Sequence, residues 1–108
     1  MPNMTIFINA EMMPPEPNLA ELTEECARLC TDILNAALDN VHVIYVAALQ
    51  GRGHPAYAEI KYRLAPFRTP SVMDDFMARL DEAIKRHARL TARIRCFGYP
   101  ADAAYARN

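Results

Sequence analysis

Apolar and polar positions recur with two different periods along this chain, and the changes of period predict its elements. Met4–Ala10 and Val41–Leu49 are short runs rich in Ile, Val and Phe, which favours strands. The second run is nearly all apolar, as is typical of a strand buried on both faces. Tyr57–Leu64 alternates strictly between apolar and polar residues, which predicts a strand with one solvated face, and Ala92–Phe97 is predicted as the last strand.

Two segments between these strands show helical spacing. From Leu19 the apolar residues recur every three or four positions, and we expect a helix that begins at the capping residue Asn18 and ends near Leu38. The second helix is expected to begin at Thr69–Pro70 or Ser71, with basic residues towards its end that suit the helix dipole. Proline-rich or glycine-rich stretches separate the elements and predict loops.

The order strand-helix-strand, repeated once, predicts an α+β fold in a single domain over residues 1–108. Each helix is a crossover between two strands, so each half is expected to hold a parallel strand pair. The result is a four-stranded mixed sheet with two helices on one face. Nothing in the chain is left to cover the other face, on which we expect these charged side chains: Glu59, Lys61, Arg63, Arg93 and Arg95.

Composition narrows the classes of function. The formal net charge is −1 and the isoelectric point about 6.3, which argues against nucleic acid or an anionic membrane as a partner. No apolar run approaches the roughly 20 residues that span a bilayer, and the start lacks the features of a signal peptide. The three cysteines do not suggest a disulfide framework. Cys26 and Cys30 lack a second pair of ligands, so no metal is expected. Because the chain shows no membrane span, no signal peptide and no disulfide framework, the predicted location is the cytoplasm.

Pro2 stands directly before the first predicted strand. If Met1 is removed after synthesis, the nitrogen of Pro2 becomes a secondary amine. A terminal amine has a pKa of about 7.7–8.0, and burial or neighbouring cations lower that value because they disfavour the ammonium form. Such an amine can act as a general base near neutral pH.

The whole chain resembles the tautomerase superfamily, in particular its macrophage migration inhibitory factor and 5-carboxymethyl-2-hydroxymuconate isomerase types. The likeness lies in Pro2 before Thr5–Asn9, in Asn40–Val46, in Gly53–Ala58 and in Phe97-Gly98 with its proline-containing tail. It implies a homotrimer whose three sheets line a central barrel with the helices outside. It also implies a cofactor-independent isomerase that moves a proton in a small keto or enol carboxylate.

In this resemblance Pro2 is the catalytic base, and nearby cationic residues bind the substrate's carboxylate. Small members carry arginines where this chain has His42 and Met12. The candidates for substrate binding are Arg95, which we favour, and also Arg93, Arg52, His42, Phe97 and Tyr99. By strand alternation Arg95 shares a face with Arg93 and Phe97.

Two alternatives remain open. The ending Phe97-Gly98 and Pro100-Ala101 resembles that of cis-3-chloroacrylic acid dehalogenases, which implies hydrolytic dehalogenation or decarboxylation. Those enzymes need a carboxylate in the tail to activate water, and the matching position here is Ala104, with Asp102 the only acid nearby. The other alternative is a ferredoxin-like module that shares the order of elements and binds a ligand or partner without chemistry.

Overall fold

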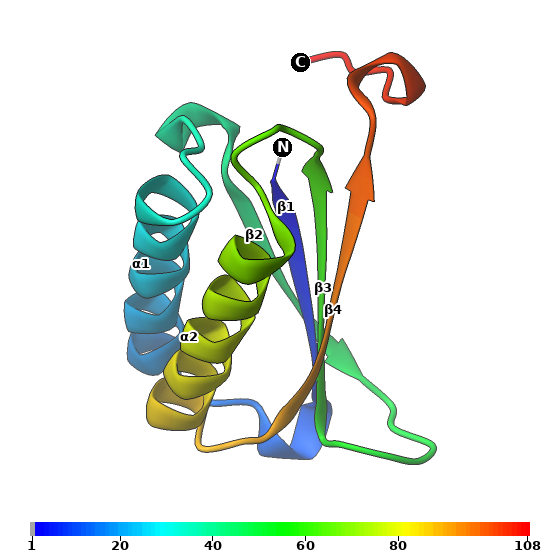
Figure 1. The fold of residues 1–108 in the computed structure, drawn as a ribbon. Helices are drawn as coiled ribbons and strands as arrows, with labels where there is room; N and C mark the ends of the chain where they lie inside the picture. Colours follow the sequence, from blue (N-terminus) through cyan, green and yellow to red (C-terminus); the bar gives the residue numbers. More distant parts are fainter. Residues whose placement is uncertain (1) are drawn as a thin grey trace.

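The computed structural model describes residues 2–108 as one sheet covered by two helices (Figure 1). The elements follow in the order β1 (Asn3–Asn9), α1 (Glu16–Asp32), β2 (His42–Ala48), β3 (Ala56–Arg63), α2 (Pro70–Ala88) and β4 (Ala92–Tyr99). Short 3-10 helices lie at Ala10–Met12, Leu38–Asn40 and Ala101–Ala103. Both helices lie on the same side of the sheet, so its other side is open, as the sequence predicts.

The strands are arranged in the order β2-β1-β3-β4. β1 pairs in parallel with β2, β3 pairs in parallel with β4, and β1 and β3 join the halves as antiparallel neighbours. This is the predicted α+β fold, a four-stranded mixed sheet built from two βαβ units. The ferredoxin-like alternative is wrong, because its split βαβ units insert a strand between the two that a helix connects. Here the connected strands are direct neighbours.

The core lies between the helices and one face of the sheet. Alternate residues of the central strands are buried, and α1 and α2 each contribute a buried stripe. The fully buried side chains include Met4, Ile6, Ile8, Ile60, Leu22, Leu34, Phe76, Leu80 and Ile84. Each such side chain contributes roughly 1.5–3 kcal/mol when it leaves water. This packing therefore fixes which face of the sheet is closed and which is open.

Helix α1 differs from its predicted bounds at both ends. It begins at Glu16 and not at Asn18, because Pro17 is accepted in the first turn of a helix, where its missing N–H is not needed. The Asn18 side chain instead donates to the carbonyl oxygen of His87 on α2. The helix ends at Asp32, since Asn35 adopts a left-handed φ of 52° and turns the chain away before Leu38.

Strand β2 is an edge strand, so the prediction that it is buried on both faces is wrong for a single protomer. Ile44 is 57% exposed, and Leu49 just beyond the strand is fully exposed. Only one face of β2 packs on the core, through residues such as Val43 and Tyr45. Neither helix covers the apolar side chains that β2 carries on the open face of the sheet.

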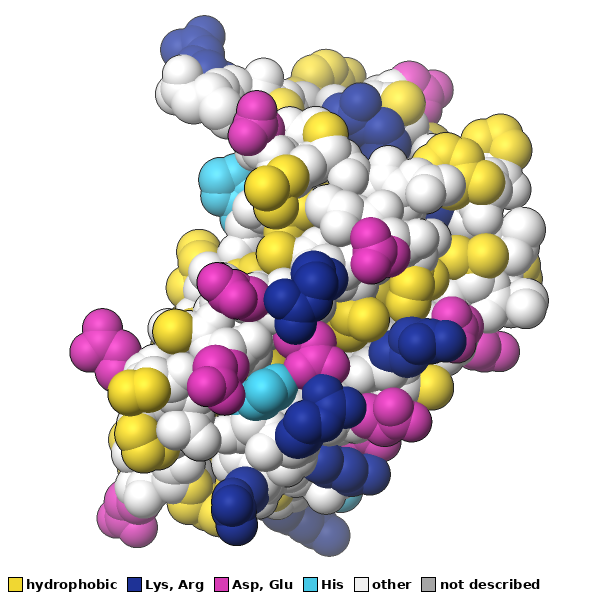
Figure 2. Space-filling model, turned by 90° about the vertical axis from the view of Figure 1, so that its left-hand side faces the viewer, with side chains coloured by type: hydrophobic (Ala, Val, Ile, Leu, Met, Phe, Trp, Pro, Cys, Tyr) yellow, Lys and Arg dark blue, Asp and Glu magenta, His cyan; other side chains and the backbone are white. Residues whose placement is uncertain are grey.

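The two helices are joined near their solvent side by a charged cluster. Glu25 on α1 accepts hydrogen bonds from Arg86 and pairs with His87, both on α2. These contacts lower the pKa of Glu25, mainly through the hydrogen bond from Arg86. The rest of the outer helical surface carries acidic and basic side chains interleaved (Figure 2). Within residues 2–108 neither helix is long and apolar enough to cross a membrane.

We expect Glu25→Gln to weaken the contact between the helices and to lower Tm at pH 7 by about 4 °C, the equivalent of roughly 1 kcal/mol. Because the pKa of Glu25 is lowered in the folded state, its contribution is present above the ordinary glutamate pKa. It is lost as pH falls through the lowered value, so the difference in Tm should shrink in acid. Thermal melts between pH 7 and pH 3 measure this effect.

The matched control is Glu24→Gln. Glu24 is 80% exposed and lies 3.9 Å from Arg28, so its removal should change Tm by no more than about 1 °C. Equal changes in Tm for the two variants would contradict a specific role of Glu25 between the helices.

Candidate active site

Pro2 lies at the amino-terminal end of the central strand β1 and is almost completely buried, with under 2% of its surface exposed. It continues the buried series that Met4, Ile6 and Ile8 form on the helix side of the sheet. Its carbonyl oxygen accepts a hydrogen bond from the backbone N–H of His42 at 3.2 Å, which ties this end of β1 to β2. Burial of this kind disfavours a charged amine and lowers its pKa. Met1 lies outside the described residues.

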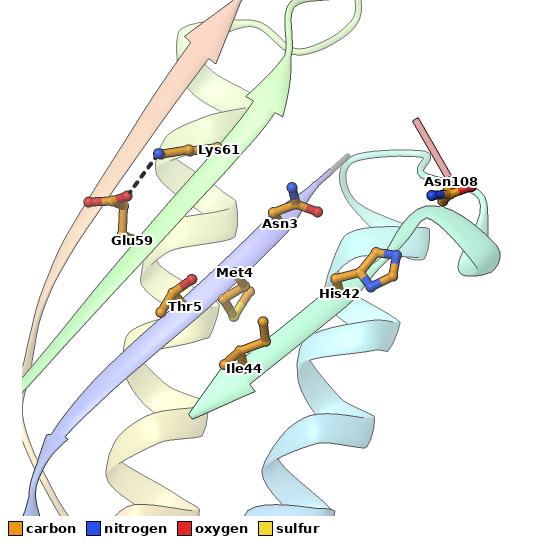
Figure 3. Close-up of a pocket in the computed structure, with 8 residues that line it drawn as sticks. All are labelled: Asn3, Met4, Thr5, His42, Ile44, Glu59, Lys61 and Asn108. Carbon is orange, nitrogen blue, oxygen red and sulfur yellow. Dashed lines mark ion pairs between the residues drawn. The ribbon is translucent and has the colours of Figure 1, made fainter. Parts of the chain in front are cut away.

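His42 and Tyr99 lie at the same end of the sheet as Pro2. His42 stands opposite Asn3 in the register, and Tyr99 is paired with Arg63 at the end of β3. His42 lines a hollow of about 410 Å³ on the open face, which we call the His42 pocket (Figure 3). Its other lining residues are Asn3, Met4, Thr5, Ile44, Glu59, Lys61 and Asn108. The sequence-predicted residues His42 and Tyr99 are therefore close to the amino-terminal strand end but separate from the arginines.

The predicted arginines come together in a second hollow, of about 620 Å³, at the other end of the open face. We call it the arginine pocket; it is lined by Arg52, Gly53, His54, Ala56, Tyr57, Arg93, Arg95 and Phe97. Strand alternation places Arg93, Arg95 and Phe97 on one face of β4, as predicted. Arg52 reaches the same hollow from the loop between β2 and β3. Four of the six predicted substrate-binding residues thus line a single pocket.

Tyr57, which lines the arginine pocket, contacts a second aromatic ring and one carboxylate, both outside the lining of this pocket. Tyr57 stacks on Phe7 with 5.9 Å between ring centroids, and its hydroxyl donates to Glu59 at 3.0 Å. Desolvation and this hydrogen bond raise the pKa of Tyr57, while the nearby Arg93 and Arg95 oppose the shift. Glu59 also lies 3.5 Å from the ammonium of Lys61 (Figure 3). The carboxylate is therefore already engaged with Tyr57 and Lys61.

Within one protomer, Pro2 and the arginine pocket do not form a common site. Arg95 is level with Thr5, because Thr5 pairs with Glu59 and Glu59 pairs with Arg95. Arg95 is thus three positions along the sheet and two strands across from Pro2, a separation of about 14 Å for ordinary strand spacing. The two residues also face opposite sides of the sheet. Pro2 and Arg95 of one protomer therefore do not face a common hollow.

The sequence analysis missed Arg68, which lies near the Pro2 end of the sheet. Its Nε donates to the carbonyl oxygen of Leu34 and its Nη1 to that of Arg63. Arg68 also lines a wide cleft of about 840 Å³ together with Arg63, His42, Asn3 and the tail residues Tyr105 to Asn108. Its position in an irregular loop gave no periodic signal, although its place just before the Thr69 cap could have suggested an anchoring role.

The residues considered for other chemistry are not assembled into a site. Asp102 is exposed in the short helix Ala101–Ala103, and Ala104 behind it has no polar side chain. Cys26 and Cys30 are buried in the core, and desolvation raises their pKa values to about 12 and about 11. Among residues 2–108 no group of three His, Cys, Asp or Glu side chains could hold a metal ion.

Solved structures with the same fold are similar over nearly the whole chain. A macrophage migration inhibitory factor-like protein from Entamoeba histolytica superimposes with a TM-score of 0.75 at 13% identity, over 97% of this chain and 95% of that one. N1, a member of the cis-3-chloroacrylic acid dehalogenase family, superimposes with a TM-score of 0.81 at 17% identity, over 97% of this chain and 80% of that one. A fused 4-OT symmetric trimer superimposes with a TM-score of 0.79 at 14% identity, over 98% of this chain and 94% of that one.

No family model and no curated protein matches the sequence. The structural neighbours confirm the predicted resemblance at the level of the fold. At identities of 13–17% these neighbours establish the fold alone. The activity of this chain must be argued from its own residues.

Replacement of Arg68 should show that it anchors the loop before α2. Arg68→Gln leaves the carbonyl oxygens of Leu34 and Arg63 without their donors, at a cost of about 1–2 kcal/mol in the free energy of unfolding. Chemical denaturation measures the change. Arg63→Gln is the control, since its side chain makes no hydrogen bond to the described residues; it should stay within about 0.5 kcal/mol. An equal loss in both variants would argue against the anchor.

Proposed function

We propose that this chain is a cofactor-independent tautomerase that moves a proton between oxygen and carbon of a small keto or enol carboxylate. The observation that carries the proposal is Pro2, buried at the start of the central strand of a fold that the chain shares with tautomerase superfamily proteins. No other residue type could supply a secondary amine at this position.

Pro2 is the general base in this proposal. Its neutral nitrogen takes a proton from the enol hydroxyl, and the resulting ammonium returns a proton to the neighbouring carbon to give the ketone; the reverse direction uses the same two steps. A nitrogen bonded to Met1 is an amide without a basic lone pair. The proposed activity therefore requires that Met1 is removed.

The substrate's carboxylate is bound by arginine, and Arg95 remains the favoured residue. A guanidinium holds a carboxylate through two parallel hydrogen bonds, and its charge also disfavours the ammonium form of a neighbouring amine. Because Pro2 and Arg95 are about 14 Å apart on opposite faces of one sheet, we propose that Pro2 of one copy works with the arginine pocket of the next. A homotrimer in which the open faces line a central barrel would allow this arrangement.

Three features support the homotrimer. The open sheet face is uncovered, its edge strand β2 exposes Ile44, and Phe97 on the opposite edge strand is 43% exposed. Exposed apolar side chains on edge strands favour association through those edges. Two neighbours of the same fold are described as trimers, one symmetric and one asymmetric.

Hydrolytic dehalogenation is less well supported. It needs a carboxylate that activates water, and the tail offers only Asp102, whose side chain is exposed to solvent beyond the end of β4. We therefore rank proton transfer above hydrolysis for this chain.

Pro2→Ala should abolish most of the tautomerase activity on a phenylpyruvate-type enol, because the amine becomes primary and is less constrained. We expect kcat/KM to fall by at least about 100-fold, within the usual contribution of a general base, while Tm changes little. Mass spectrometry of the purified protein must show that Met1 is absent. Full activity in Pro2→Ala, or in protein that retains Met1, would refute the role of Pro2.

The protein should sediment as a homotrimer of the 12.2 kDa chain at micromolar concentration. Ile44→Lys places a charge on the exposed face of the edge strand and should shift the species towards monomer. Analytical ultracentrifugation distinguishes the two states, and Leu38→Lys, an exposed residue outside the sheet, is the control. A stable monomer of the unmodified chain would remove the inter-subunit site.

A further inference from the structure

Glu59 is the only acidic residue in the four strands of the described sheet. Its side chain lies on the open face, between Tyr57 and Lys61 on its own strand and opposite Arg95 of β4 in the register. Neighbouring strands are about 4.8 Å apart, whereas residues i and i+2 of one strand are about 7 Å apart. By backbone position alone, Arg95 is therefore nearer to this carboxylate than Lys61 is.

The Glu59 carboxylate nevertheless turns along its own strand and away from Arg95. One of its oxygens accepts a hydrogen bond from the Tyr57 hydroxyl at 3.0 Å, and the other lies 3.5 Å from the ammonium of Lys61 (Figure 3). Among residues 2–108, no carboxylate pairs with Arg95, whose guanidinium donates to the backbone carbonyl of Ile94. The charge of Arg95 therefore remains unneutralised where this residue lines the arginine pocket.

Of the two contacts that Glu59 makes, the one with Tyr57 is the better fixed. The Tyr57 ring stacks on Phe7 with 5.9 Å between centroids, so its hydroxyl is held in place. The Lys61 side chain is 49% exposed, and an ion pair of this kind contributes little. A hydrogen bond to a carboxylate is stronger than one between neutral groups. Desolvation and then this hydrogen bond raise the pKa of Tyr57, so the hydroxyl keeps the proton that it donates.

We propose that Tyr57 is a positioning residue: it holds the Glu59 carboxylate away from Arg95 and so keeps this guanidinium free for an anionic ligand. Without the hydroxyl, a change of rotamer brings the carboxylate to Arg95, because the two residues lie opposite one another on neighbouring strands. The ion pair formed there competes with the ligand. The role of Arg95 in binding rests on the proposed function, whereas the placement of Glu59 is a property of the sheet alone.

The first test is Tyr57→Phe, which keeps the ring and its stacking on Phe7 and removes only the hydroxyl. A crystal structure of the variant should show the Glu59 carboxylate paired with Arg95. Benzoate, which carries one carboxylate on a flat ring, is the probe for isothermal titration of the full chain. Its affinity should fall about threefold to fivefold, the range expected when an exposed ion pair competes with the ligand.

The second test is rescue by the double variant Tyr57→Phe/Glu59→Gln. A neutral amide cannot neutralise Arg95, so benzoate affinity should return to within about twofold of that of the unmodified chain. If Tyr57 only supported the local packing, the double variant would bind benzoate as weakly as Tyr57→Phe. Recovery of affinity therefore separates positioning of the carboxylate from a structural effect.

Tyr45→Phe is the matched control. It also removes a tyrosine hydroxyl that makes hydrogen bonds, in this case to Thr23 and to the carbonyl oxygen of Leu19, on the helix side of the sheet. Benzoate affinity should stay within about twofold of that of the unmodified chain, because no charged group near Arg95 is released.

Three results would each overturn the inference. They are a Glu59 carboxylate that stays away from Arg95 in the Tyr57→Phe structure, benzoate affinity that is absent in the unmodified chain or unchanged in Tyr57→Phe, and no recovery in the double variant. Neither the crystal structures nor the benzoate titrations require catalysis. The expected results in a protein without tautomerase activity would therefore refute only the proposed reaction.

Discussion

The packing of α1 and α2 on one face of the sheet determines the rest of this structure. It buries alternate residues of β1 and β3 and the apolar stripes of both helices, so the register of the strands is fixed by which side chains must leave water. The opposite face carries the charged side chains that cannot be buried in the core, including the arginines of β4 and the glutamate and lysine of β3. The candidate site is a direct consequence of this division between the two faces.

The open face is electrostatically incomplete in one protomer. Its single well-placed carboxylate, Glu59, serves Tyr57 and Lys61, while the three arginines of the pocket have no acidic partner among the described residues. Pro2 lies at the far end of the same sheet and on its closed side. Both facts favour the same interpretation: the face functions when it is covered by further copies of the chain and occupied by an anionic ligand.

Much of this arrangement follows from sequence because it depends on local periodicity. Strict alternation in Tyr57–Leu64 predicted the two faces of β3, and the same reasoning placed Arg93, Arg95 and Phe97 together. The predicted start of α1 was wrong because Pro17 is tolerated in a first helical turn. The predicted end of α1 was wrong because Asn35 adopts a left-handed conformation. Arg68 was missed because its partners are backbone carbonyls, and its place just before the Thr69 cap was the only sequence signal for them. The distance between Pro2 and Arg95 depends on strand order, which periodicity alone does not determine.

The proposed reaction depends most directly on the protonation state of the Pro2 nitrogen. Protein labelled with ¹⁵N-proline and freed of Met1 allows the pKa of this amine to be measured by NMR titration. Burial of Pro2 disfavours the ammonium, and in the proposed homotrimer the arginines of an adjoining copy would do the same, so we expect a pKa at least about one unit below the usual 7.7–8.0. A pKa of about 8 or above would contradict it, because the nitrogen would then be largely protonated at neutral pH and could not act as the base.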